Sequence, residues 1–316
     1  MTRTKTTSRF GLLQARARRY VLPGFLLGAV MAGGLYFWVG SLLSAPALRP
    51  VGPPPEFLKA EKVEIPSESG SVLSAWFSAP PQAKAGVVLL HCVRCNRLDM
   101  LPRAELLWRA GYAILLPDLQ AHGESPGEAI TFGHLESRDA VASIAYLRRR
   151  IPGLPVAGLG ASLGGAAFLL APGGPQVDAL ILESVYPTIE EAVSNRIAIR
   201  LGPLSKPLTP LLLAQLGPRL GLDPGDLRPI DHIGTLRCPV LLLSGTEDLH
   251  TPRAETERLY AAASEPKQLW LVPGAAHQDL LRFSPEAYSQ KILSFLDEHL
   301  LPRRPGVSNP TPPLEP

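Results

Sequence analysis

Three residues with the chemistry of a nucleophile, an acid and a base follow apolar runs in this sequence. Ser162 lies in the segment GASLG, which satisfies the pattern G-x-S-x-G. Asp248 follows the apolar run 239–245, and His277 follows the run 268–274. A serine hydroxyl becomes a good nucleophile when an imidazole takes its proton, and a carboxylate orients that imidazole and stabilises its charged form. The types and their order predict a catalytic triad of Ser162, Asp248 and His277.

Each of the three residues also has a structural interpretation. Strand ends rich in glycine and alanine match the serine pattern by chance, and a lone Asp248 or His277 is more often a turn residue or a hydrogen-bonded loop histidine. Glu247 is a competing acid, although neighbouring positions at a strand end point in different directions. The combination, with separations of 86 and 29 residues along the chain (162 to 248 and 248 to 277), favours the triad.

The elements that must position these residues can be read from the hydrophobic pattern. Residues 62–77 alternate apolar and polar side chains around a turn signal, which predicts an antiparallel hairpin. Near-continuous apolar runs then alternate with helix-like spacing, as expected of strands buried on both faces of a parallel sheet. The expected strands are 86–91, 112–118, 155–160, 178–184, 239–245 and 268–274, and the expected helices are 101–110, 134–150, 163–171, 252–263 and 285–300. This alternation predicts an α/β fold.

The sequence resembles the α/β-hydrolase superfamily, in particular its bacterial esterase-like and serine-aminopeptidase-like members, from residue 62 to about 301. Besides the order Ser162, Asp248, His277, the segment LLPDLQAHGES is similar to the family loop D-x-x-G-H-G-x-S, with Ala121 in place of a glycine. LILESVYP and RPIDHIGTLRCPVLLLSGTED are also similar to that branch. The resemblance implies an α/β-hydrolase fold with helices on both faces of the sheet, a structural role for His122, and chemistry without a cofactor or a metal.

The segment HCVRCNR contains Cys92 and Cys95 in a C-x-x-C pattern, which alone is compatible with a redox dithiol, a metal site or a structural pair. The resemblance implies that this is the oxyanion loop, with donors at the backbone N–H groups of Val93 and Leu163. Cys92 occupies a position where the family usually has glycine. If that position needs a positive φ, cysteine costs about 1–2 kcal/mol or the loop shifts. We expect a structural pair and leave open whether it forms a disulfide; Cys238 is expected to be a small core residue.

A leucine-rich segment at 185–231 stands where hydrolases of this fold insert a cap. Caps commonly cover the active site and set substrate size. Its leucines indicate either an apolar pocket for lipid-like esters or ordinary helices that pack on the sheet.

The N-terminal region predicts a membrane anchor. Residues 1–20 contain six basic side chains, and residues 21–45 contain no charge. Twenty-five helical residues reach about 37 Å, enough to cross a hydrocarbon core. The positive-inside rule then places the N-terminus in the cytoplasm and the body outside it. A cleaved signal peptide is the alternative, residues 46–61 are expected to form a Pro-rich spacer, and the Pro-rich tail 302–316 to be disordered.

Charge and composition narrow the function further. Without the six N-terminal basic residues, the net charge is −3, from 25 basic and 28 acidic residues, so nothing indicates a nucleic-acid surface. The sequence predicts a membrane-anchored serine hydrolase that acts on a small ester or acyl substrate, with amides or peptides less favoured. The alternatives are a non-catalytic binding protein with a hydrolase fold and a redox protein that uses Cys92 and Cys95.

Overall fold

The computed structural model describes residues 9–301, with only the helical backbone described for residues 9–20 and 22. The chain divides into a unit that ends at Ala45 and a body that begins at Pro46. The first unit is helix α1 (Arg9–Ser44), whose stretch Pro23–Ser44 is long and apolar enough to cross a membrane. Its most apolar window is 0% buried, unlike a core helix, which leaves a membrane span or a signal sequence. The predicted tail, and residues 1–8 of the predicted basic segment, lie outside the described residues.

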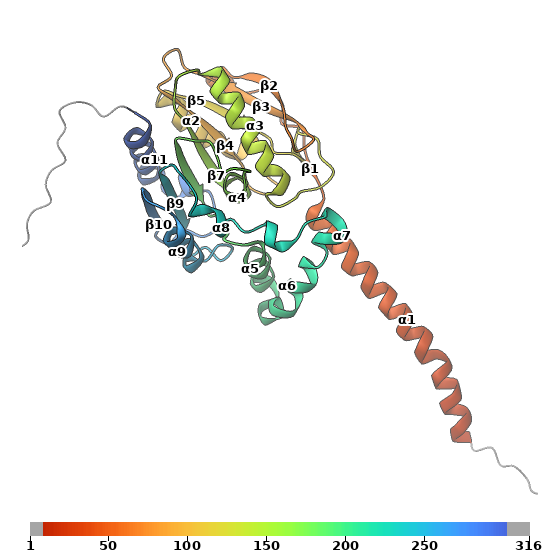
Figure 1. Cartoon of the computed structure of the whole chain (residues 1–316). Coiled ribbons are helices and arrows are strands. Elements are labelled where there is room, and N and C mark those ends of the chain that lie inside the picture. Colours follow the sequence, from red (N-terminus) through yellow and green to blue (C-terminus); the bar gives the residue numbers. More distant parts are fainter. Residues whose placement is uncertain (1–8, 302–316) are drawn as a thin grey trace, which may run out of the picture. The chain divides into compact units, whose positions relative to one another are not determined.

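The body is built on an eight-stranded sheet with the order β10-β9-β8-β7-β4-β5-β3-β2 (Figure 1). The strands are β2 (Glu61–Pro66), β3 (Val72–Ser78), β4 (Ala85–Leu90), β5 (Tyr112–Pro117), β7 (Val156–Ala161), β8 (Ala179–Glu183), β9 (Val240–Gly245) and β10 (Lys267–Val272). Strands β2 and β3 form the predicted antiparallel hairpin, β3 pairs antiparallel with β5, and the other pairs are parallel. The predicted mostly parallel sheet is confirmed.

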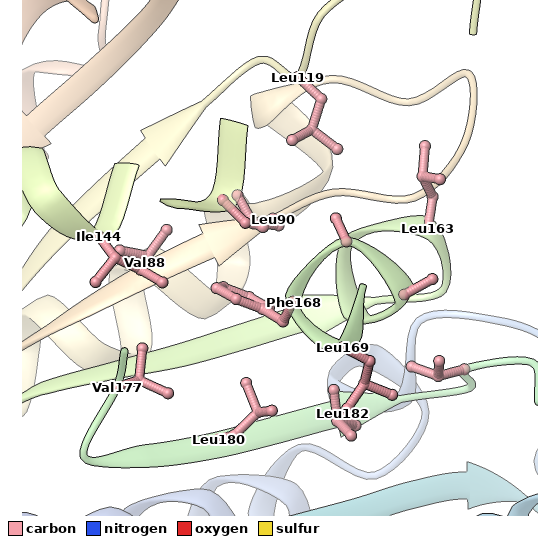
Figure 2. Packing of buried hydrophobic residues seen from close by; sticks show 14 of the residues in the cluster. Val88, Leu90, Leu119, Ile144, Leu163, Phe168, Leu169, Val177, Leu180 and Leu182 are labelled. Atoms are coloured by element: carbon pink, nitrogen blue, oxygen red, sulfur yellow. The ribbon is translucent and has the colours of Figure 1, made fainter. Parts of the chain in front are cut away.

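Helices cover both faces of this sheet and enclose two hydrophobic cores. Alternate residues of β4 show the division, since Val88 and Leu90 belong to one core and Val87 and Leu89 to the other. The first core includes side chains of α3 (His134–Arg150), α4 (Leu163–Leu169) and α9 (Arg253–Ala262), and the second includes those of α2 (Leu101–Arg109) and α11 (Pro285–Leu300). Figure 2 shows the first core around Phe168 of α4.

The segment between β8 and β9 is helical, as expected of an insertion at this point. It contains α5 (Ile189–Leu201), η3 (Gly202–Leu204), α6 (Ser205–Leu213), α7 (Leu216–Leu220), η4 (Pro224–Asp226) and α8 (Ile230–Ile233). Several of its apolar side chains face solvent, with Leu201 51% and Leu204 56% exposed. The insertion therefore does not bury all of its leucines in the core.

The Pro-rich segment after α1 is joined to the body by hydrogen bonds almost from its first residue. Strand β1 (Ala47–Leu48) pairs in parallel with β6 (His122–Gly123). The N–H of Ala47 donates to the carbonyl of Ala121 (2.8 Å), and the N–H of Val51 donates to the carboxylate of Glu124 (3.0 Å). The segment predicted to be a spacer thus begins with residues that belong to the body, and the 3-10 helix η1 (Glu56–Leu58) follows them.

Candidate active site

Ser162 lies at the sharp turn between β7 and α4. Its backbone has φ 49° and ψ −107°, a conformation that residues other than glycine rarely adopt. Its N–H donates to the carbonyl of Glu183 at the end of β8 (2.8 Å), which holds the strained peptide in place. The turn therefore presents the serine at the carboxyl edge of the parallel strands, as a G-x-S-x-G nucleophile elbow does.

Two glycines make this turn possible. A Cβ on Gly164 would lie 2.3 Å from the carbonyl oxygen of Leu90 on β4, and a Cβ on Gly160 would lie 2.5 Å from the backbone carbon of Gly164. In both cases the obstacle is backbone, which cannot move aside as a flexible side chain can. The glycines of the motif are thus required by close backbone packing.

The structure brings Asp248 and His277 into direct contact. Nδ1 of His277 and Oδ2 of Asp248 are 2.8 Å apart. The same carboxylate accepts hydrogen bonds from the hydroxyl (2.8 Å) and N–H (2.9 Å) of Thr251 and from the N–H of His250 (2.8 Å). Glu247, the competing acid, is exposed. The acid that orients His277 is therefore Asp248.

The hydrogen bonds to Asp248 also set its charge. Burial alone raises the pKa of a carboxyl, but the contact with His277 and the donors of Thr251 outweigh it and lower the pKa of Asp248 to about 2. Asp248 is consequently an anion at neutral pH. It can stabilise a positive charge on the neighbouring imidazole.

Ser162 and His277 line one cavity of about 220 Å³. The other lining residues are Cys92, Asp99, Met100, Arg103, Ala161, Glu183, Ser184, Gln278 and Asp279. Within the described part of the chain, no hydrogen bond joins the hydroxyl of Ser162 to His277. Catalytic hydrogen bonds are often long before substrate binds, so the shared cavity is the informative observation.

The loop after β4 contains the two cysteines, which form a disulfide, Cys92–Cys95. The N–H of Cys95 also donates to the carbonyl of Cys92 (3.2 Å), so the loop is a closed turn. Cys92 does not adopt a positive φ; that conformation falls on Arg94 instead, at φ 60°. Of the two alternatives, strain at Cys92 or a shifted loop, the structure has no strain at Cys92, and the left-handed residue of the turn lies two positions later.

The predicted oxyanion donors are the backbone N–H groups of Val93 and Leu163. Leu163 is the first residue of α4, and the first amides of a helix have no acceptor within the helix. Val93 precedes the left-handed residue of the disulfide loop. Of the described residues, Cys92 lines the cavity, whereas Val93 and Leu163 are not part of its lining. Their role as oxyanion donors remains a prediction.

His91 ties the disulfide loop to the loop after β5. Its Nε2 accepts from the N–H of Leu119 (3.0 Å), and its Nδ1 is 2.8 Å from the carbonyl of Cys92. Complete burial, with His122 nearby, lowers the pKa of His91 to about 3, so the ring is neutral. His122 is also buried and bonds through Nδ1 to the carbonyl of Gln120 (2.8 Å). Both rings hold loops in place, as predicted for His122.

A second buried contact joins the segment after the disulfide to the loop after β5. Arg97 is fully buried; its N–H donates to Asp118 (2.7 Å), and its guanidinium contacts both Asp118 and Glu124. The carboxylate of Asp118 also accepts from the N–H of Glu124 (2.8 Å). Ala121, which replaces the family glycine, has φ 57° in this loop. The loop thus keeps a left-handed conformation without the glycine that usually supplies it.

Three charged residues of the cavity wall were not predicted from the sequence. Arg103, Glu183 and Asp279 lie on α2, at the end of β8 and after His277, and all three line the cavity. The one signal in the sequence was a charged Glu183 at the end of the apolar run ALILE. His250, whose ring centroid is 4.7 Å from that of His277, was also missed.

The chain is similar in sequence to proteins of one family. A sequence model described as the alpha/beta hydrolase family matches residues 87–291. An uncharacterized protein of Mycobacterium tuberculosis is 31% identical over 82% of this chain and 88% of its own length. An uncharacterized protein of Bacillus subtilis is 26% identical over 74% of this chain and 78% of its own length.

Solved structures with the same fold include two esterases. An esterase of Pyrococcus furiosus has a TM-score of 0.68 and 21% identity, covering 82% of this chain and 98% of its own. An esterase of Exiguobacterium antarcticum has a TM-score of 0.55 and 16% identity, covering 75% of this chain and all of its own (100%). At these identities the likeness is one of fold.

The disulfide gives a first prediction. Replacing both cysteines, Cys92→Ser with Cys95→Ser, should lower the free energy of unfolding by about 2 kcal/mol, because a four-residue loop is no longer closed in the unfolded chain. Urea denaturation in detergent measures the change. A reducing agent should destabilise the wild type by a similar amount and leave the double variant unaffected. Equal stability of the two proteins under oxidising conditions would contradict this account.

Asp248 gives a second prediction, on pH. Its pKa of about 2 is below the ordinary value of 3.8, so its charge stabilises the fold by at most about 2 kcal/mol. Because the pKa is lower in the folded state, this contribution is complete above about pH 4 and disappears as the pH falls through 2. The difference in melting temperature between wild type and Asp248→Asn should therefore shrink from pH 5 to pH 2.

The control for the pH experiment is Glu247→Gln, which removes an exposed carboxylate next to Asp248. Its difference from the wild type should stay small throughout this range. A gap between wild type and Asp248→Asn that stays constant from pH 5 to pH 2 would show that the charge of Asp248 does not stabilise the fold.

Proposed function

The chain belongs to the alpha/beta hydrolase family, and from this premise we propose that it is a serine hydrolase that cleaves carboxylic esters, with amides or peptides as weaker substrates. The observation that carries the proposal is the hydrogen bond between His277 and a charged, buried Asp248 beside the cavity that Ser162 also lines. The esterases of the same fold support the choice of ester.

The proposed mechanism assigns one role to each residue. Ser162 attacks the carbonyl carbon while Nε2 of His277 takes its proton, and Asp248 stabilises the imidazolium that forms. The alcohol leaves with a proton from His277, and an acyl-enzyme remains on Ser162. Water then attacks the acyl group while His277 takes its proton, and His277 returns that proton to the oxygen of Ser162 as the acid leaves. The N–H groups of Leu163 and Val93 are proposed to bind the oxyanion.

The cavity favours small substrates at the reacting carbon. Its volume of about 220 Å³ is below the usual range of 300–1,000 Å³ for pockets that hold drug-sized ligands. The leucines of the insertion are not part of its lining. Short-chain esters are therefore the substrates proposed, rather than the lipid-like esters that the leucine content of the insertion suggested.

The proposed location is the outer side of a membrane, with α1 as the anchor. The six basic residues before residue 21 favour a cytoplasmic N-terminus. The Cys92–Cys95 disulfide supports the same orientation, because disulfides persist in oxidising compartments and are rare in the cytosol.

Ser162 provides the direct test of the proposed activity. Ser162→Ala should abolish labelling by a fluorophosphonate probe and lower the kcat for p-nitrophenyl acetate by at least about 10³-fold, since the nucleophile is lost. The matched control is Ser184→Ala, because Ser184 lines the same cavity. It should keep fluorophosphonate labelling, which identifies Ser162 as the serine that reacts. Turnover that survives Ser162→Ala would exclude Ser162 as the nucleophile, and wild-type protein with neither labelling nor turnover would favour a binding protein.

Fusions to the C-terminus test the proposed orientation. Alkaline phosphatase, which folds only where its disulfides form, should be active there, and a fusion to green fluorescent protein exported by the same route should be dark. The unfused chain should keep its full mass of 34.0 kDa in the membrane fraction. A shorter, soluble product would indicate a cleaved signal peptide, and a fluorescent fusion with inactive phosphatase would reverse the orientation.

A further inference from the structure

One buried guanidinium joins the segments that form the candidate active site. We propose that Arg103 is a positioning residue that holds the His277 loop in register with the Ser162 elbow; this inference rests on the proposed serine-hydrolase function. Arg103 lies on α2, with its side chain 5% exposed, and it contacts carboxylates from two other segments of the site.

The first contact is with the strand end beside Ser162. Nε of Arg103 donates to both carboxylate oxygens of Glu183 (3.0 and 3.1 Å), and Nη2 donates to Oε2 (2.6 Å). The backbone carbonyl of Glu183 accepts the N–H of Ser162. Arg103 thus holds, through the side chain of Glu183, the peptide to which the strained Ser162 is hydrogen-bonded.

The second contact is with the loop of His277. Nη1 of Arg103 is 3.1 Å from Oδ1 of Asp279, which lies two residues after His277. The carboxylate of Asp279 caps helix α10 (Leu280–Phe283) by accepting from the N–H groups of Leu281 (3.0 Å) and Arg282 (3.3 Å). Asp279 therefore fixes where the loop ends, and Arg103 fixes the position of Asp279 relative to β8.

Arg103 is also close in sequence to the disulfide loop. Helix α2 begins at Leu101, directly after η2 (Arg97–Met100), which follows Cys95. Cys92 and Met100 line the cavity together with Arg103. The side chain that joins the serine elbow to the histidine loop thus comes from a helix that follows the disulfide loop in the chain.

Arginine suits this role better than lysine. Its planar guanidinium carries five N–H donors in a fixed fork, so it can bind Glu183 with two nitrogens while the third reaches Asp279. Tyr288 completes the enclosure, because its hydroxyl donates to Glu183 and its ring centroid lies 5.4 Å from the guanidinium carbon. A lysine ammonium in this place could keep one of these carboxylate contacts but not their relative geometry.

The inference predicts an effect on turnover rather than on substrate binding. Ser162 and His277 come from different loops, and a displacement of about 1 Å between reacting groups can cost about 10²-fold in rate. Arg103 holds both loops from the wall of the cavity. Loss of the network should therefore lower kcat with little change in KM.

The test replaces the whole buried network by apolar side chains, Arg103→Met with Glu183→Leu and Tyr288→Phe. Removing all three polar groups together leaves no fully buried charge unpaired, because Asp279 is partly exposed and keeps Arg282 as a partner. Such replacements are often neutral for stability. We expect a melting temperature close to that of the wild type, at least about 10-fold lower kcat for p-nitrophenyl acetate and slower fluorophosphonate labelling, with KM within about threefold. A folded triple variant that retains its kcat within about twofold would overturn the proposal.

A second variant decides the question if the triple variant does not fold. Asp279→Ser keeps a capping oxygen for α10 but is too short to reach Nη1 of Arg103. It should lower kcat at an unchanged melting temperature, and an unchanged kcat would overturn the proposal. Arg103→Lys should recover only part of the wild-type kcat. The matched control is Arg109→Met on the same helix, which breaks only an exposed pair with Glu105 and should change nothing.

These outcomes separate the two proposals. Wild-type protein with neither fluorophosphonate labelling nor turnover removes the serine-hydrolase function itself. Labelled wild type, together with equally active network variants, removes the positioning role of Arg103 and leaves the function in place.

Discussion

The contact between the turn after β7 and the backbone of β4 is the constraint on which the site depends. A side chain on Gly164 would collide with the carbonyl of Leu90, and a side chain on Gly160 would collide with the backbone of Gly164. This packing forces Ser162 into its strained conformation and directs its N–H to the carbonyl of Glu183. The position of β8, and of everything attached to its end, is thereby set relative to the serine.

Two charged networks lie near the site. Arg97 contacts Asp118 and Glu124, and Arg103 contacts Glu183 and Asp279 in the wall of the cavity. Buried ion pairs contribute little net stability, because desolvation offsets their attraction. Their directional hydrogen bonds can instead fix loops that have little apolar surface of their own. Each network joins loops that follow different strands of the sheet.

The features that sequence alone predicted are those governed by local patterns. Periodicity identified six strands and five helices of the body to within one or two residues, but it gave no bounds for β1, β6, α10 or the helices of the insertion. The confirmed family follows from motifs of a few residues each. The hydrogen bond between Asp248 and His277 agrees with the predicted triad. The role of these residues in catalysis is still a proposal, as is that of the oxyanion donors.

The features that sequence did not predict depend on contacts between distant residues. Arg103 and Glu183 are 80 positions apart, and no periodic pattern connects them. The sign of φ in the disulfide loop depends on hydrogen bonds that form only in the folded chain, so the sequence left strain at Cys92 or a shifted loop as alternatives, and the positive φ occurs at Arg94. Strand β1 has two residues, too few to produce a pattern.

The early pairing of β1 limits how far the body can move from its helix. Only Ala45 and Pro46 separate the end of α1 from the first paired residue, Ala47, and three extended steps of chain span no more than about 11 Å. Anchored in a bilayer through α1, a body on so short a connection would not sample the bulk solution. With α1 in a bilayer, it would encounter substrates within the thin water layer next to the lipid headgroups, so that partitioning of the substrate into that layer, more than its bulk concentration, would govern the rate of encounter.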